Sequence, residues 1–280
     1  MKLLGIVILY YPDDTLAGNI NSYIEGVAQL IVWENSPASF AVDIPVNPKI
    51  IKMGNGANAG IGKALNEAAK YAKANGFTHL LTMDQDSCFE HDHFSKYISM
   101  VEKMNEKTIF SPNYMIYGEQ IHKIQDTFID AGASIQSGSL YPIAIFDEIG
   151  FFREDLIVDG IDTDFFYRAK NNGISTKIVT PAFLVHRLGY PQKQYKFLNI
   201  SIAAFHERSA LRSYYFIRNH LLVRKQYSEH NPYLFYNLYK RLFLVVFFET
   251  DKQAKMKGLI MGYIHGKMGK TGMQTIFKKS

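Results

Sequence analysis

Cysteine and long apolar runs are almost absent from this 280-residue chain. Cys88 is its one cysteine, so no internal disulfide can form, which fits a reducing cytoplasm. No uncharged run reaches the roughly 18–20 residues that a membrane span needs. The apolar residues 1–9 lack a small-residue cleavage site and predict a first buried strand rather than a signal peptide. We therefore expect a cytoplasmic protein without a membrane span.

A phosphate-binding loop of the Walker type is also absent. No Gly-Lys-Ser or Gly-Lys-Thr sequence follows the glycine-rich stretch 54–62, and the stretch does not match the dinucleotide-binding fingerprint. Small residues still let the backbone approach a ligand closely, and the N-terminus of a helix favours phosphate. The stretch therefore indicates a loop beside an anionic ligand without identifying that ligand.

What is present is an ordinary globular composition, with 47% hydrophobic and 20% charged residues. Strand-like runs alternate with helical patterns as far as residue 205: strands at 3–10, 29–34, near 49–52, 78–83 and 107–111, and helices at about 15–28, 59–75 and 91–104. This alternation predicts an α/β domain, residues 1–205, with a mostly parallel sheet flanked by helices. Residues 206–280 predict an extension of two or three amphipathic helices.

The most informative motif is a pair of acids at the end of a predicted strand. The apolar run 80–83 leads directly into Asp84 and Asp86. In open α/β sheets, ligands bind outside the carboxyl ends of the strands. Two carboxylates there form a hard-oxygen site for Mg²⁺ or Mn²⁺, which can hold a diphosphate and neutralise its charge as it leaves. Because many surface loops contain Asp-x-Asp, the motif needs support from the rest of the chain.

Two other predicted strands end in side chains that suit a nucleobase. Tyr11 follows the first strand, and an aromatic ring there can pack on a base; alternatively, Tyr11-Pro12 makes a turn. Glu34 ends the second strand, where a carboxylate can accept the imide hydrogen of uracil or thymine. The following Asn35-Ser36 also suits a helix or turn cap. Both alternatives remain open.

A third acidic segment lies farther along the chain. Asp162 opens a predicted aromatic helix, and a carboxylate there can accept a proton from an attacking hydroxyl. An N-cap role is the common alternative for an aspartate at such a place. Asp159 and Asp164 are rivals for the role of the base.

Taken together, these segments resemble inverting glycosyltransferase family 2 and, within it, the bacterial rhamnosyltransferase-like branch. The resembling segments span about residues 3–225 and include 58–66, 81–87, 137–140, 159–168, 185–189 and 212–219. The resemblance implies a GT-A fold and a sugar nucleotide donor, dTDP-L-rhamnose before a UDP-sugar. It also implies a glycan or polyprenyl-diphosphate-linked acceptor and a place in surface polysaccharide biosynthesis. A sugar-nucleotide-binding protein or a nucleotidyltransferase on a similar fold is the alternative.

By position in the family's motifs, the resemblance assigns seven residues. Tyr11 and Glu34 would line the base pocket, and Asn58 and Asp84 would lie near the ribose and diphosphate. Asp86 and His186 would bind the metal, and Asp162 would be the general base. Two positions depart from the family's pattern. Glutamate stands at 34, where aspartate is usual, and isoleucine stands at 161, where many relatives place an acid.

The charge of the chain is divided unevenly. Residues 1–205 carry 17 Lys and Arg against 22 Asp and Glu, whereas residues 206–280 carry 14 against 4. This asymmetry indicates that the extension meets something anionic. Its basic, aromatic stretch 212–225 fits peripheral contact with a membrane, a solvated helical face or an oligomer contact. It contains no nucleic-acid-binding motif, so nucleic acid is not expected as a partner.

Overall fold

The computed structural model describes residues 1–37, 42–104, 107–116, 118–124, 126–187, 192–197, 200–230 and 234–276. Residues 188 and 189, which belong to one of the resembling segments, lie outside this range. The chain forms two compact units. The first comprises Met1–Arg153 and Asp162–Arg187, and the second comprises Glu154–Ile161 and Leu188–Ser280.

The first unit is built on a mixed, mostly parallel sheet with the strand order β3-β2-β1-β4-β9-β6-β10-β5. Its first four strands are parallel: β1 (Leu3–Leu9), β2 (Gln29–Glu34), β3 (Ile50–Gly54) and β4 (His79–Asp84). The others on this path are β5 (Ser87–Phe89), β6 (Ile109–Ile116), β9 (Leu140–Pro142) and β10 (Thr176–His186). Two short strands pair with β6 and β10, namely β7 (Glu119–Gln120) and β8 (Phe128–Ala131). The α/β class predicted from sequence is confirmed.

This topology brings the ends of several strands to one edge. β4 is antiparallel to β9, β9 is antiparallel to β6, and β6 is parallel to β10, so β4 and β10 run in the same direction. Asp84 and His186 therefore end their strands on the same side of the sheet. The chain turns to β2 and β3 on one side of β1 and returns to β4 on the other. This reversal of strand order is where ligands of open α/β sheets bind.

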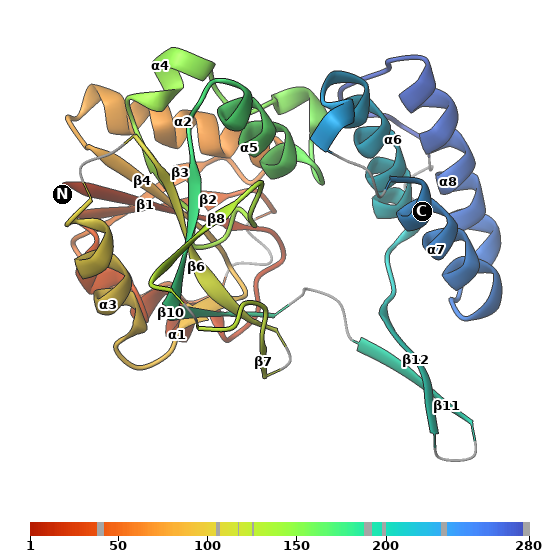
Figure 1. Ribbon diagram of the computed structural model, residues 1–280, viewed down its shortest axis with the longest axis horizontal. Coiled ribbons are helices and arrows are strands. Elements are labelled where there is room, and N and C mark those ends of the chain that lie inside the picture. The colour runs from red at the N-terminus through yellow and green to blue at the C-terminus, as the bar shows by residue number, and fades with distance from the viewer. Residues whose placement is uncertain are drawn as a thin grey trace. The chain divides into compact units, whose positions relative to one another are not determined.

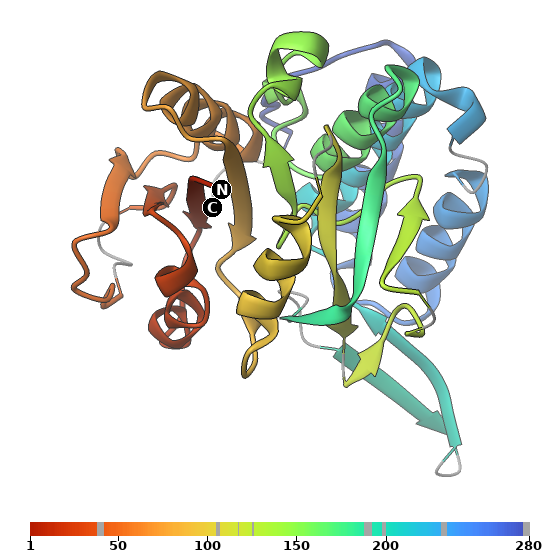
Figure 2. The same cartoon turned by 60° about the vertical axis from the view of Figure 1, so that its left-hand side comes forward.

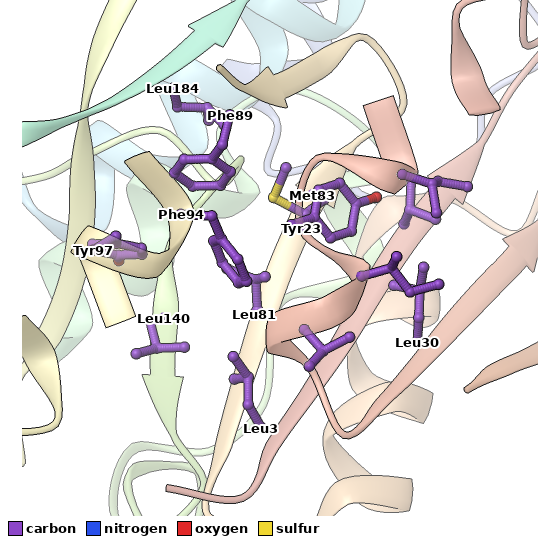
Figure 3. Packing of buried hydrophobic residues seen from close by; sticks show 14 of the residues in the cluster. Leu3, Tyr23, Leu30, Leu81, Met83, Phe89, Phe94, Tyr97, Leu140 and Leu184 are labelled. Carbon is purple, nitrogen blue, oxygen red and sulfur yellow. The ribbon is translucent and has the colours of Figure 1, made fainter. Parts of the chain in front are cut away.

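Helices cover both faces of the sheet (Figures 1 and 2). α1 (Leu16–Asn21) and α3 (His93–Val101) lie on one face, and α2 (Ile61–Ala74), α4 (Ile145–Ile149) and α5 (Ile161–Asn171) lie on the other. Figure 3 shows the core under α3, where Phe94 and Tyr97 pack with Leu81 and Met83 of β4. All seven residues of β1 are buried, as expected for a strand covered on both sides.

The predicted helix over residues 15–28 is shorter in the structure. α1 ends at Asn21, and a separate turn of 3₁₀-helix covers Ile24–Gly26. The Ser22 hydroxyl donates to the carbonyl of Asn19 and accepts from the amide of Phe89 at the end of β5. Gly26 sits against the ring of Phe94, which a Cβ would approach to 2.5 Å. Tertiary contacts thus interrupt a pattern that favours a longer helix.

The second unit is helical apart from an antiparallel pair, β11 (Gln192–Phe197) and β12 (Ile200–His206). Its helices are α6 (Ala210–Gln226), α7 (Leu234–Phe247) and α8 (Lys252–Lys267). α8 packs on α6 through glycines: a Cβ at Gly258 would lie 2.4 Å from the carbonyl of Ala210, and one at Gly262 would lie 2.5 Å from that of Tyr214. Within the described parts of the chain, no helix is long and apolar enough to cross a membrane.

Several members of the basic, aromatic stretch of α6 face inward. Tyr214, Tyr215 and Arg218 are buried. The guanidinium of Arg218 lies 4.7 Å from the ring centroid of Tyr215 and donates to the carbonyls of Leu156 and Gly272. These three side chains build the interior of the second unit and do not contribute to a surface.

Candidate active site

The two predicted metal ligands, Asp86 and His186, lie together with Asp84 at the carboxyl edge of the sheet. One ligand atom from each of Asp84, Asp86 and His186 lies within 4.8 Å of the others. Asp84 ends β4, Asp86 lies in the turn to β5, and His186 ends β10, which pairs with β5. Two carboxylates and an imidazole form a donor set that suits Mn²⁺ or Mg²⁺.

The electrostatics of Asp86 fit a cation. Burial raises the pKa of this carboxyl, and the neighbouring His186 opposes that shift. Its Oδ1 atom is buried without a hydrogen-bond partner and lies 3.9 Å from Nδ1 of His186. A buried carboxylate oxygen that accepts no hydrogen bond is costly unless a positive charge compensates it. A divalent ion between the three side chains would supply that charge.

His186 is held by the residue that follows Asp86. Its Nδ1 lies 2.7 Å from the hydroxyl of Ser87, and both side chains are buried. When Nδ1–H donates to Ser87, the lone pair of Nε2 is left for an ion. Hydrogen bonds of this kind fix the tautomer and the ring orientation of metal-binding histidines. The chain thus places a ligand and its support side by side, at 86 and 87.

The glutamine between the two acids joins their loop to β1. Gln85 accepts from the amide of Tyr10 at 2.7 Å and donates to the carbonyl of the same residue at 3.0 Å. The carbonyl of Gln85 accepts from Asn19 of α1 at 2.7 Å. Sequence reasoning passed over Gln85, because its role depends on a partner 75 positions away. The two bonds fix the metal-side loop against the end of β1, where Tyr11 lies.

The predicted base-pocket residues end neighbouring strands. Tyr11 follows β1 in the left-handed region, with a φ of 49°, and is 47% exposed, so its ring is accessible to a ligand. Its amide donates to the hydroxyl of Ser36 just beyond β2. Glu34 is half-buried at the end of β2, beside β1 in parallel register. The turn interpretation of Tyr11 and its place beside Glu34 are compatible.

Asn58 serves the glycine-rich loop itself. Its Oδ1 atom accepts from the amide of Gly60 and from the side chain of Asn35, which in turn accepts from the amide of Ala59. Gly54 is required where the loop leaves β3, because a Cβ there would lie 2.5 Å from the carbonyl of Glu34. Asn35 is a further residue that sequence reasoning treated only as a cap. It ties the end of β2 to the start of α2.

The segment 137–140 is hydrogen-bonded to the end of β4, the strand that carries Asp84. The hydroxyl of Ser137 accepts from the amide of Asp84 at 3.0 Å, and the amide of Gly138 donates to the carbonyl of Thr82 at 2.7 Å. Gly138 has a φ of 78°, and a Cβ there would lie 2.7 Å from the ring of Pro112. Only glycine suits this backbone conformation and this close approach to β6.

Asp162 lies in the first turn of α5 and is half-buried. Its Oδ1 atom accepts from the amide of the next residue, Thr163, at 2.7 Å. An N-cap side chain accepts from an amide two or three residues on, and α5 begins at Ile161, so this bond is not that of an N-cap residue. Burial, and then the Asp162 carboxylate, hold the pKa of Tyr141 well above its ordinary range. Burial raises the pKa of Tyr114 to about 12, with a further contribution from Asp84. Asp84 and Asp162 thus each raise the pKa of a buried tyrosine, Tyr114 and Tyr141 respectively.

The rival acids are engaged elsewhere. Asp164 is fully buried, 3.5 Å from Arg153 and 3.2 Å from Arg168. Asp159 belongs to the second unit and lies 3.0 Å from Arg212. Asp162 is half-buried in the same turn in which Asp164 is an internal ion-pair partner. It does not belong to the group of Asp84, Asp86 and His186.

The segment before Asp162 is held by α6. Asn219 donates to the carbonyls of three of its residues, Leu156, Val158 and Asp159. This contact fixes a backbone that is left-handed at Ile157, Asp159 and Gly160. The strained turn leads directly into α5, which explains why the motifs 159–168 and 212–219 occur together.

Comparison with known proteins agrees with this geometry. No family model matches the chain. The dTDP-rhamnosyl transferase RfbF of Shigella flexneri is 29% identical over 240 residues, which cover 78% of each chain. This chain is a glycosyltransferase, and its sequence is similar to that of a dTDP-rhamnosyl transferase.

Solved structures of glycosyltransferases share the fold. GalNAc-T7 with UDP, GalNAc and Mn²⁺ aligns with a TM-score of 0.57 at 10% identity, over 95% of this chain and 56% of that one. The 1–349 segment of TarS from S. aureus, in complex with UDP-GlcNAc, aligns with a TM-score of 0.55 at 13% identity, over 95% of this chain and 81% of that one. This glycosyltransferase therefore spans little more than half of GalNAc-T7, and at such low identity the likeness concerns the fold.

A hydrogen-bond partner of His186 gives a first test of the metal site in this glycosyltransferase. We expect Ser87→Ala to weaken Mn²⁺ binding about 10- to 100-fold, because the imidazole loses the group that orients it. Titration calorimetry with MnCl₂ measures the change. Ser95→Ala, on the exposed side of α3, is the matched control and should leave the affinity unaltered. Equal affinity in the wild type and Ser87→Ala would contradict the assignment.

Proposed function

We propose that this protein transfers L-rhamnose from dTDP-L-rhamnose to a glycan or lipid-linked acceptor in surface polysaccharide biosynthesis. The transfer is inverting and depends on Mg²⁺ or Mn²⁺. The observation that carries the proposal is the meeting of Asp84, Asp86 and His186 in a chain that is similar to a dTDP-rhamnosyl transferase over 240 residues. The order of strands at that edge of the sheet supports it.

The proposed chemistry is a single displacement. The Asp162 carboxylate takes the proton from the acceptor hydroxyl, whose oxygen attacks the anomeric carbon. The bond from that carbon to the diphosphate oxygen breaks on the opposite face, so the configuration inverts. Asp84, Asp86 and His186 would hold a cation that, when bound, neutralises charge on the diphosphate. The two hydrogen bonds between the Gln85 side chain and the backbone of Tyr10 would keep these acids in a fixed position relative to Tyr11 and the nucleobase.

Donor choice gives the direct test. In a thermal-shift panel with Mn²⁺, we expect dTDP-L-rhamnose to raise the melting temperature by several degrees. At a hundred times its dissociation constant, a ligand adds about 2.7 kcal/mol to the stability of the folded state. UDP-glucose and UDP-GlcNAc at the same concentration are the comparison ligands.

Free dTDP and Asp86→Asn are the controls for this panel. The nucleotide alone should give a smaller shift, and the variant should lose the part of the shift that requires Mn²⁺. A larger response to a UDP-sugar would reject the rhamnose donor. Release of free L-rhamnose without transfer to any acceptor glycan would reject the acceptor assignment.

A further inference from the structure

α7 exposes its apolar side. Five large side chains recur at helical spacing along it, and they are 38–67% exposed: Tyr239, Leu242, Phe243, Val246 and Phe247. Surface helices of globular proteins show the reverse arrangement, with charged residues outward. An exposed apolar stripe of this length marks an interaction site.

Charged side chains hold the helix in this orientation. Arg241 and Glu249 are 5% and 2% exposed, and the guanidinium donates to both carboxylate oxygens of Glu249. Lys255 of α8 is 3% exposed and lies 3.2 Å from the same carboxylate. Rotating α7 to bury its aromatic residues would expose one side of this ion cluster and break it. The apolar stripe is therefore fixed outward.

The exposed surface continues onto α8. Ile260, Tyr263 and Ile264 are 40–52% exposed, and Met268 at the end of the helix is 62% exposed. A groove of about 570 Å³ lies between the end of α7 and the start of α8, with Val246, Met256 and Ile260 among its lining residues. We call these exposed apolar residues of α7 and α8 the outward face.

The exposed charges around the outward face are mostly positive. Lys240, Lys252, Lys257 and Lys267 are exposed. Within residues 234–276 the sequence contains two acids, of which Glu249 is buried in the ion cluster and Asp251 is exposed. Apolar residues bordered by lysines suit an interface that is apolar within and anionic at its rim. A second copy of the chain would bring the same lysines together, so the pattern does not favour a dimer.

We propose that the outward face docks onto an anionic lipid surface, with the apolar side chains among the acyl chains and the lysines at the headgroups. An amphipathic helix of this kind lies in the plane of the interface. The purpose of docking, which is access to a lipid-linked acceptor, rests on the proposed function. The docking itself does not.

Vesicle co-sedimentation of the full chain tests this proposal. We expect binding to vesicles of phosphatidylcholine with phosphatidylglycerol, little binding to pure phosphatidylcholine, and weakening by salt. Phe243→Ser with Phe247→Ser should lower the partition coefficient at least about tenfold, and so should Lys252→Glu with Lys257→Glu. Ile121→Ser with Lys123→Glu, an exposed apolar and basic pair in the first unit, is the matched control and should bind as the wild type does.

Two measurements separate the outcomes. The melting temperature of each variant shows that it is folded, and these exposed positions should leave it unchanged. Undiminished vesicle binding by the Phe243/Phe247 variant would overturn the proposal. So would a dimer in light scattering that this variant dissociates, because the face would then bind a second copy. Wild-type chain that turns over dTDP-L-rhamnose but ignores anionic vesicles would reject docking and leave the transferase assignment standing.

Discussion

Asp162→Asn is expected to lower kcat for sugar transfer by about 10²- to 10⁴-fold, the usual contribution of a positioned general base. A carboxamide has almost the same shape as the carboxylate but cannot accept the proton of the acceptor hydroxyl. Its oxygen can still accept from the amide of Thr163, so the start of α5 should be preserved. Donor binding, measured by thermal shift with dTDP-L-rhamnose, should therefore remain close to that of the wild type.

The neighbouring acids serve as controls for this prediction. Asp164→Asn should mainly lower the melting temperature, because Asp164 is buried between Arg153 and Arg168. Asp159→Asn should disturb a contact with Arg212 in the second unit without removing a base. If Asp162→Asn transferred sugar at the wild-type rate while Asp159→Asn did not, the base would be Asp159.

The metal-side acids were predictable because of their local pattern. A buried strand that ends in Asp84 and Asp86 needs only the rule that parallel strands share a carboxyl edge. His186 lies about 100 positions away, and the sequence around it is that of an ordinary buried strand. The resemblance to a family suggested this residue, and the pairing of β10 with β5 explains its position.

The supporting residues could not be predicted in the same way. Gln85, Asn35 and Ser137 act through hydrogen bonds to backbone atoms that are distant in sequence, and backbone groups leave no trace in a residue pattern. The attachment of residues 154–161 to the second unit has the same origin, because Asn219 binds their carbonyls. The sequence shows that polar side chains lie near the motifs, but it does not show which backbone atoms they bind.

The C-terminal helices show a different limit. Helical periodicity in 234–247 predicts an apolar stripe, and any such stripe is normally assigned to the core. The sequence around it also contains Arg241, Glu249 and Lys255, whose mutual contacts decide which side faces inward. The net charge of residues 206–280 predicts an anionic partner, but part of the basic excess is internal, because Arg218, Arg241 and Lys255 are buried. Burial lowers the pKa of Arg241 against the opposing effect of Glu249, as expected for a pair inside the unit.

The largest stability effect is expected at this pair. Glu249→Gln should lower the free energy of unfolding by about 3–5 kcal/mol, because it leaves Arg241 and Lys255 as buried cations with one fewer anion. Glu207 contacts Lys255, but a single carboxylate cannot compensate the charges of both Arg241 and Lys255. Urea unfolding followed by circular dichroism measures the loss. Glu67→Gln removes a carboxylate from an exposed pair with Lys70 on α2, and should change stability by less than about 0.5 kcal/mol.

A compensating variant distinguishes an uncompensated charge from a packing defect. Replacing Arg241, Glu249 and Lys255 with Met, Leu and Met removes both cations that Glu249→Gln leaves with one fewer anion. Glu207 then loses Lys255 as a partner but still accepts hydrogen bonds from Thr250. Buried ion clusters replaced by apolar side chains of similar volume are often as stable as the original. Recovery of most of the lost stability would show that the cluster orients α7 rather than stabilises the unit. A triple variant as unstable as Glu249→Gln would show instead that the cluster is required for folding, and a stable triple variant that no longer exposes its aromatic stripe would lose vesicle binding.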